Sequence, residues 1–177
     1  DVKCHYVKVA FLLHFDPGTI VVDDRGYNDY HLFAKWTSEE VSFVTRSKGN
    51  AVYTVIEERD VPQYRSVLKD ELIVFSGIGA AEKYPYPLRR IEFYDDEKEQ
   101  IFVFLTNNLK LGATTVAAIY KDRWQIELFF KAIKQNLKIK TFVGTTANAV
   151  QIQIWTALIA MLILRYLQLK ASFSWSL

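Results

Sequence analysis

The sequence contains few of the residues that cross-link small proteins or hold structural metals. Its 177 residues include a single cysteine, Cys4, and three histidines. One cysteine cannot form an internal disulfide, and it excludes a cysteine-rich zinc site. This cysteine content fits a reducing cytosol.

A charge excess and a membrane-spanning run are also lacking. The 22 lysines and arginines are nearly balanced by 20 aspartates and glutamates, for a formal net charge of +2. The longest apolar run, residues 154–164, is short of the roughly 20 residues that a membrane span needs. The first residues include neither an initiator methionine nor the layout of a signal peptide. We therefore expect a cytosolic fragment of a longer protein, with no membrane partner.

What is present is the composition of a folded protein. Hydrophobic residues make up 50% of the chain and aromatic residues 15%, which excludes an intrinsically disordered chain. Basic residues gather between positions 120 and 140, where six cations against Asp122 and Glu127 give a local charge of +4. The cations are Lys121, Arg123, Lys131, Lys134, Lys138 and Lys140. A polyanion is expected to dock on this segment.

Periodicity predicts alternating helices and strands, and hence an α/β chain. Helices are expected at residues 2–14, from a cap at Asn28 to Trp36, from Thr114 or Thr115 to about 140, and at 147–169. Strands are expected at residues 19–22, 41–45, 52–56, 71–75, 88–94 and 100–106, the last two forming a hairpin.

Two of these elements are expected to be buried. The strand at residues 19–22 is apolar and β-branched, as in strands that are covered on both faces. The helix at residues 147–169 is apolar nearly all round its middle, which predicts a core position with Trp155 and Tyr166 as core aromatics.

One expected helix places four polar side chains on a single stripe. At 3.6 residues per turn the four fall within about 60° of one another. They are Tyr120, Arg123, Glu127 and Lys134. A carboxylate flanked by two cations and a phenol suits a divalent metal and the phosphate oxygens that it polarises. The alternative is a solvated amphipathic helix, which is the commoner case for an arbitrary helix.

A pair of aspartates follows the expected strand at residues 19–22. Functional groups gather at the carboxyl ends of strands in open α/β sheets, so Asp23 or Asp24 is a candidate metal ligand. The two lie on opposite sides of an extended backbone. A plain β-turn is the alternative, because aspartate and glycine favour turns.

Four further polar residues are weaker candidates. Arg46 and Lys48 follow the strand at residues 41–45, where phosphate contact and simple solvation are equally good explanations. His5 and His14 have no second ligand at metal spacing, so we interpret them as surface or core histidines.

Two strings of residues together carry a resemblance. The spacing Tyr-x2-Arg-x3-Glu-x6-Lys from Tyr120 to Lys134, with the string Asp24-Arg25-Gly26-Tyr27, resembles the DDE transposases of bacterial insertion sequences. Within these it resembles the Y-R-E-K subgroup, the insertion-sequence-four family. The resemblance implies a ribonuclease-H-like fold, in which helices flank a mixed sheet, with a β-rich insertion. It divides the chain into a first core part at residues 1–50, the insertion at 51–110 and a helical second core part at 111–177.

The resemblance also implies a site and its chemistry. Asp24 and Glu127 would be catalytic and would bind Mg²⁺ (or Mn²⁺), two ions in the complete enzyme, with Asp23 as the runner-up to Asp24. Tyr120, Arg123 and Lys134 would bind DNA phosphates. The implied reaction is metal-dependent strand cleavage and strand transfer at insertion-sequence ends.

Partners and limits follow from the same resemblance. It implies double-stranded DNA at the insertion-sequence ends, target DNA and a homodimer, in the nucleoid-associated cytoplasm of a bacterium. The first catalytic aspartate of the family belongs on a strand that precedes this sequence. We therefore expect a fold that is incomplete at its amino terminus, and a chain that is inactive alone and poorly soluble. Two alternatives are a non-catalytic DNA-binding remnant and a ribonuclease-H-like nuclease outside transposition.

Overall fold

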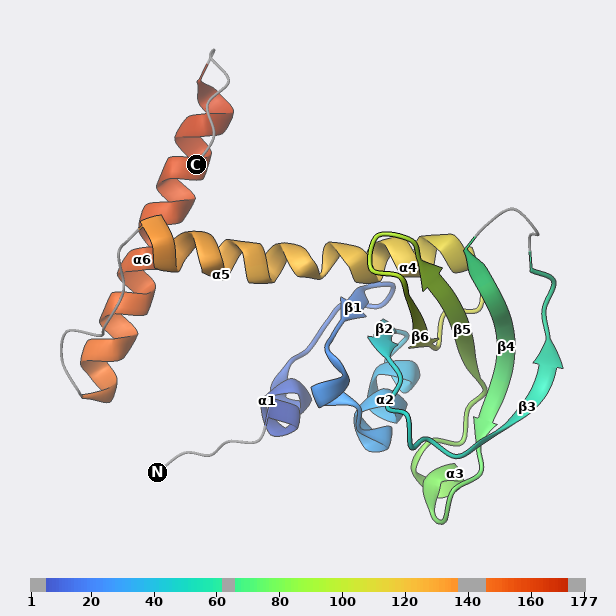
Figure 1. Ribbon diagram of the computed structural model, residues 1–177. Coiled ribbons are helices and arrows are strands. Elements are labelled where there is room, and N and C mark those ends of the chain that lie inside the picture. The colour runs from blue at the N-terminus through green and yellow to red at the C-terminus, as the bar shows by residue number, and fades with distance from the viewer. Residues whose placement is uncertain (1–5, 62–65, 137–145, 172–177) are drawn as a thin grey trace. The chain divides into compact units, whose positions relative to one another are not determined.

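The computed structural model describes residues 6–61, 66–136 and 146–171, and the chain divides into two compact units, Asp1–Arg123 and Trp124–Leu177. The first unit contains, in chain order, α1 (Tyr6–Leu12), β1 (Ile20–Val22), the 3-10 turn η1 (Arg25–Tyr27), α2 (Tyr30–Ser38), β2 (Ser42–Arg46), β3 (Tyr53–Glu58), β4 (Val67–Phe75), α3 (Ala80–Lys83), β5 (Leu88–Asp95), β6 (Gln100–Thr106) and α4 (Ala113–Asp122) (Figure 1).

Six strands of the first unit form one mixed sheet in the order β1-β2-β6-β5-β4-β3. β1 pairs parallel with β2, and the other neighbours are antiparallel. The expected hairpin is confirmed as β5 and β6, and the Asp95 carboxylate fixes its turn by accepting hydrogen bonds from the N–H groups of Glu97 and Lys98. The predicted fold class, a mixed sheet flanked by helices, is confirmed.

Helices pack on both faces of the sheet because successive residues of a strand point to opposite faces. In β2, Phe43 joins the core formed with α1 and α2, where its ring stacks on Phe33 at 4.3 Å between centroids. The next residue, Val44, joins a second core with Val116 and Tyr120 of α4. The first unit is therefore a three-layer structure whose sheet lies between two hydrophobic cores.

β1 lies at an edge of the described sheet, and this position corrects one expectation. The sequence predicts a strand buried on both faces, but Ile20 is exposed and Val21 and Val22 are only half-buried. β-branched composition indicates a strand, but it does not distinguish an edge strand from a central one.

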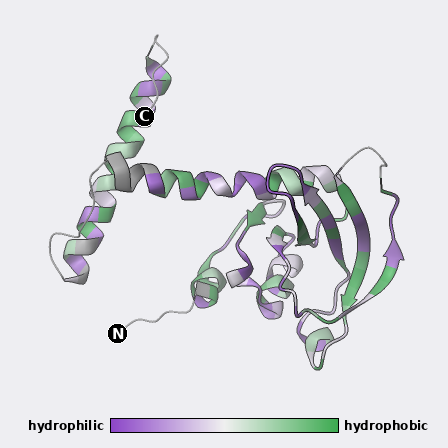
Figure 2. Ribbon diagram, viewed as in Figure 1, coloured by the Kyte–Doolittle hydropathy of each residue, from purple (hydrophilic) through white to green (hydrophobic). Residues whose placement is uncertain are grey.

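The strands of residues 51–110 belong to the same sheet as β1 and β2, since β6 pairs directly with β2. The division at residues 50 and 110 remains a prediction. Between β4 and β5, Arg89 donates to both carboxylate oxygens of Asp70, at 2.7 and 2.6 Å, and both residues are buried. Figure 2 shows hydrophilic bands within these two strands. The sheet therefore holds charges as well as apolar side chains.

Two helix starts differ from the expected ones. The Asp29 carboxylate, rather than Asn28, caps α2 by accepting from the N–H groups of His31 and Leu32. α4 begins after Gly112, ahead of both expected threonine caps. In each case the cap lies within three residues of the expected one, the usual uncertainty of helix ends.

The expected continuous helix through Tyr120 and Lys134 is two helices. α4 ends at Asp122 and α5 (Trp124–Asn136) begins at Trp124. Between them the Arg123 N–H donates to the Tyr120 carbonyl at 3.2 Å, a three-residue spacing that tightens the chain locally. Arg123 itself keeps helical backbone angles, so the single stripe predicted across it remains a prediction. No proline or glycine in this segment signals the interruption.

The second unit contains α5 and α6 (Ala147–Lys170). Its described core is small and consists of Ala157 and Met161, with Phe129 packed against them. The expectation of a buried last helix is wrong, since Trp155 and Tyr166 are 64% and 60% exposed. An apolar helix surface predicts that other elements pack against it. Among the described residues of this unit, only α5 packs against α6.

The length of α6 also corrects the expectation that the longest apolar run is too short to span a membrane. Within the described part of the chain, Gln151–Lys170 is long and apolar enough to cross a membrane by length and composition. One such helix is a weak indication, because core helices of soluble proteins satisfy the same criterion.

Candidate functional site

The candidate site lies where β1 and β2 end. Because these strands are parallel, with Val22 opposite Val44, their carboxyl ends lie at the same edge of the sheet. The pairing continues for one more residue, since the Asp23 N–H donates to the Val44 carbonyl at 3.2 Å. The two consecutive aspartates therefore leave the sheet beside Thr45.

Asp24 is exposed and held in place by its own backbone. Its Oδ1 accepts a hydrogen bond from the Arg25 N–H at 2.7 Å, which makes Asp24 the cap of η1. Its carbonyl accepts from the Tyr27 N–H at 2.8 Å. Within the described residues Oδ2 accepts no hydrogen bond, so this oxygen is available to a ligand.

Asp23 has the opposite environment. It is 7% exposed, and neither carboxylate oxygen has a hydrogen-bond partner among the described residues. Burial raises the pKa of Asp23 to about 7; the nearby Thr45 hydroxyl lowers it, the Asp24 charge raises it and the Arg123 guanidinium lowers it. A carboxyl group in such a position costs free energy when it ionises.

The polar groups beside Asp23 are engaged elsewhere. The Thr45 hydroxyl is 2.9 Å from Oδ1 of Asn28, to which it donates its single proton. The Asn28 side-chain N–H donates in turn to the Arg46 carbonyl at 2.8 Å. These bonds tie the chain after η1 to the end of β2. The Thr45 hydroxyl also lies 3.4 Å from the Asp23 carbonyl, and no described donor makes a hydrogen bond to the Asp23 carboxylate oxygens.

The end of α4 supplies the next two side chains of the site. Tyr120 is buried, with its ring 5.1 Å from that of Phe104. The Arg123 guanidinium carbon lies 5.3 Å from the centre of the Tyr120 ring. Burial raises the pKa of the Tyr120 phenol, Arg123 and Arg46 lower it, and Asp24 raises it. The structure thus brings three predicted site residues, Asp24, Tyr120 and Arg123, into electrostatic range of one another.

Arg46 is a member of the site that the sequence left open. Its guanidinium carbon lies 4.4 Å from the centre of the Phe102 ring, and Lys98 approaches the same ring at 5.5 Å. Arg46 is therefore held against an aromatic face rather than simply solvated. The alternation of side chains along β2 could have indicated this position. Arg46 follows Val44 by two residues, so both side chains point to the face of the sheet that α4 covers.

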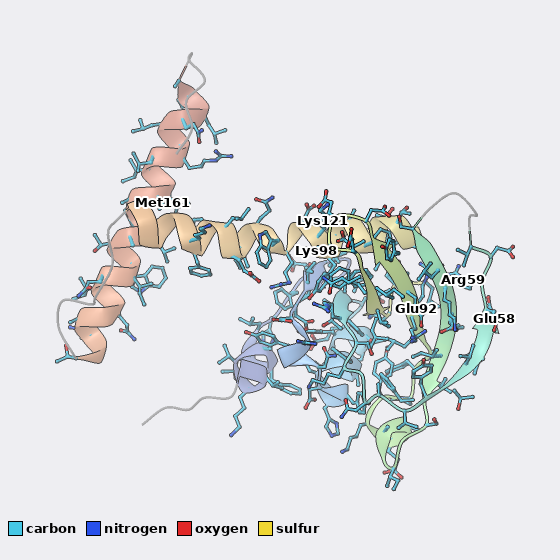
Figure 3. The ribbon with its side chains drawn as sticks, viewed as in Figure 1. Glu58, Arg59, Glu92, Lys98, Lys121 and Met161 are labelled. Atoms are coloured by element: carbon cyan, nitrogen blue, oxygen red, sulfur yellow. The ribbon has the colours of Figure 1, made fainter. Side chains whose placement is uncertain are left out.

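The surroundings of this edge carry charges of both signs, since the β5–β6 turn contains Asp95, Asp96, Glu97 and Glu99 beside Lys98. Lys98 and Lys121 lie near each other on the first unit in Figure 3, and Lys121 pairs with the exposed Glu97 at 2.8 Å. The Lys48 ammonium donates to the Asn28 carbonyl at 3.2 Å. Lys98 therefore lies against the same ring as Arg46, and Lys48 is held beside the end of η1.

The remaining predicted residues lie on α5, in the second unit. Glu127 is half-buried, and Lys134 follows it by two helical turns. The Lys134 side chain lies outside the described residues. Their joining Asp24 at one site remains a prediction.

The described carboxylates at the end of β1 are those of Asp23 and Asp24, and each offers oxygen ligands to a divalent cation on its own side of the backbone. Within the described ranges no group of three or more histidine, cysteine, aspartate or glutamate side chains is placed to hold a metal. Carboxylate oxygens are the ligands that Mg²⁺ prefers, and it is commonly held by one or two of them with waters. His14 is exposed, as interpreted, and His5 lies outside the described residues.

Comparison with known proteins gives a consistent family. Residues 4–163 match the family described as the transposase DDE domain. Over 169 residues the chain is 34% identical to a Sinorhizobium fredii protein named as transposase y4zB, covering 93% of this chain and 47% of that protein.

Two further relatives are named as transposases of insertion sequence elements. For element IS5377 of Geobacillus stearothermophilus, identity is 28% over 84% of this chain and 39% of the relative. For element IS4SA of a Synechocystis species, identity is 29% over 84% of this chain and 41% of the relative. The chain spans less than half the length of each of these three relatives. By its family match and these similarities, the chain belongs to the transposase DDE domain family.

Proposed function

We propose that this chain is part of an insertion-sequence transposase, acting in metal-dependent cleavage and transfer of DNA strands, and that it carries two of the three catalytic carboxylates. The observation that carries the proposal is the convergence of Asp24 with Tyr120 and Arg123 at the carboxyl ends of β1 and β2. The spacing from Tyr120 to Lys134 supports the Y-R-E-K subgroup.

Asp24 and Glu127 are the proposed catalytic and metal-binding residues. Members of the family generally use divalent metal ions, and we propose Mg²⁺ or Mn²⁺, two ions in the complete enzyme. When bound, such a pair activates the attacking oxygen and stabilises the leaving oxygen. Asp24 is suited to this role because its cap bond fixes the carboxylate while Oδ2 remains available.

Arg123, Tyr120 and Lys134 are the proposed phosphate-binding residues. A guanidinium can hold a phosphate through two parallel hydrogen bonds, and Arg123 is oriented against the Tyr120 ring. Arg46 adds a further cation at the same edge. The proposed partners are double-stranded DNA at the insertion-sequence ends, target DNA and a second protomer, in the bacterial cytoplasm.

DNA affinity tests the phosphate-binding role. The fluorescence anisotropy of a labelled DNA duplex would be titrated with the wild-type chain and with Arg123→Ala at several salt concentrations. Loss of one phosphate contact reduces the slope of log K against log salt by about one. Lys83→Ala is the matched control, because Lys83 is an exposed cation on α3, at the opposite end of the sheet (Figure 1).

The outcomes separate the candidate functions. Equal salt slopes for Arg123→Ala and Lys83→Ala would refute the phosphate-binding role of this edge. DNA binding that depends on Arg123, with no metal-dependent cleavage even when a segment bearing the first aspartate is supplied, would support the non-catalytic DNA-binding alternative. Cleavage restored by that segment would support the transposase.

A further inference from the structure

We propose that the Asp23 carboxylate is itself a ligand for a divalent cation at the end of β1, in addition to the Asp24 carboxylate of the motif. The class of cation rests on the proposed function. The position rests on the two unpartnered oxygens of a residue that is 7% exposed.

A buried carboxylate without a donor requires an explanation. Buried polar groups in folded proteins almost always have a partner, and an unpartnered one marks a catalytic group or a site for an ion or water. Taking a carboxylate out of water is costly unless a charge or hydrogen bonds compensate. A divalent cation supplies that compensation in full.

The neighbouring groups supply only part of it: the Arg123 guanidinium attracts the carboxylate and lowers its pKa, but neither Asp23 oxygen accepts a hydrogen bond from a described residue. The Thr45 hydroxyl has one proton, which it donates to Asn28, and the Asn28 N–H is used by the Arg46 carbonyl. Either group would have to break an existing bond to reach Asp23. The Asp23 N–H belongs to the sheet, through the Val44 carbonyl. The hydrogen bonds of the local structure are therefore complete without the Asp23 side chain, whose oxygens make no hydrogen bond with the described residues.

The two aspartates also differ in what they offer a cation. Asp24 is exposed and has one oxygen committed to the cap of η1, whereas both oxygens of Asp23 are uncommitted. Adjacent residues of an extended chain point to opposite sides. The pair therefore presents oxygens on two sides of the β1 end, an arrangement suited to more than one ion.

Mn²⁺ binding in the absence of DNA tests this proposal. The electron paramagnetic resonance signal of free Mn²⁺ would be followed during titration of the wild-type chain, Asp23→Asn, Asp24→Asn and Asp16→Asn. Asp16→Asn is the control, because it removes one exposed carboxylate from the turn after α1. We expect Asp23→Asn to weaken Mn²⁺ binding by at least about tenfold, because even the loss of a residue that only supports a metal ligand lowers metal affinity 10–100-fold. We expect Asp16→Asn to leave Mn²⁺ binding unchanged.

Each outcome bears on the proposal separately from the function. Weakened binding in both Asp23→Asn and Asp24→Asn supports it. Weakened binding in Asp23→Asn alone also supports it and refutes the ligand role of Asp24. Normal binding in Asp23→Asn overturns it and leaves the proposed transposase standing.

Folding of the metal-free variant provides the second readout. A ligand with no fold contact predicts that Asp23→Asn, in the presence of EDTA, keeps the near-ultraviolet circular dichroism of the wild-type chain. It also predicts that Mn²⁺ raises the melting temperature of the wild-type chain more than that of the variant. A metal-free Asp23→Asn that fails to fold would show that Asp23 is structural, and would overturn the proposal.

Discussion

The pH dependence of stability offers a quantitative test of the Asp23 environment. The Asp23 pKa of about 7 in the folded chain, against 3.8 for a free carboxyl, corresponds to about 4 kcal/mol at 1.36 kcal/mol per pKa unit. Because the folded pKa is the higher one, the folded state binds more protons between these values. Stability therefore falls as pH rises from about 4 to about 7. Roughly 2.5 kcal/mol of the loss falls between pH 5 and pH 8.

Urea unfolding of metal-free protein at pH 5 and pH 8 measures how much stability is lost when Asp23 ionises. Other groups titrate over the same range in every variant, so the informative quantity is the difference between the wild-type chain and Asp23→Asn. We expect the free energy of unfolding of the wild-type chain to fall by roughly 2.5 kcal/mol more than that of the variant over this interval. The same pH dependence in both proteins would refute the buried, unpartnered state of Asp23.

Further predictions concern the fold that supports the site. Asp70→Asn leaves the buried Arg89 guanidinium uncompensated and is expected to lower the free energy of unfolding in urea by about 3–5 kcal/mol. The double variant Asp70→Leu/Arg89→Met is expected to recover most of that loss. An equal loss in both variants would contradict the ion-pair explanation. Trp36→Ala removes a side chain that is 1% exposed and is expected to cost about 3–5 kcal/mol; a loss below about 1 kcal/mol would mean that this core is not packed as described. Asp29→Ala removes the α2 cap and is expected to cost about 1 kcal/mol in the same assay, an expectation that an unchanged unfolding midpoint would contradict.

The sequence predicted the sheet well because its strands carry local signals. The hairpin of β5 and β6 follows from two β-rich runs around an acidic turn. The position of Asp24 follows from an apolar strand that ends in a turn string. Both features depend on residues close together in the chain, so they could be predicted from the sequence alone.

Other features depend on contacts that a sequence does not reveal. The break at Arg123 lies in a segment without proline or glycine, and periodicity assumed a single helix there. The exposure of Trp155 depends on what covers α6, which an apolar pattern cannot state. The unpartnered state of Asp23 depends on where the Thr45 and Asn28 donors are directed, a matter of side-chain geometry.

The most direct test of the account is whether Asp24 and Glu127 hold the same metal. Fe²⁺ in place of Mg²⁺, with ascorbate and peroxide, generates hydroxyl radicals that cut the backbone next to the ion. We expect cuts at residues 23–25 and close to residue 127, both suppressed by excess Mg²⁺, and we expect the cut close to residue 127 to be lost in Asp24→Asn. Cutting at only one of these segments, or at neither, would contradict the account.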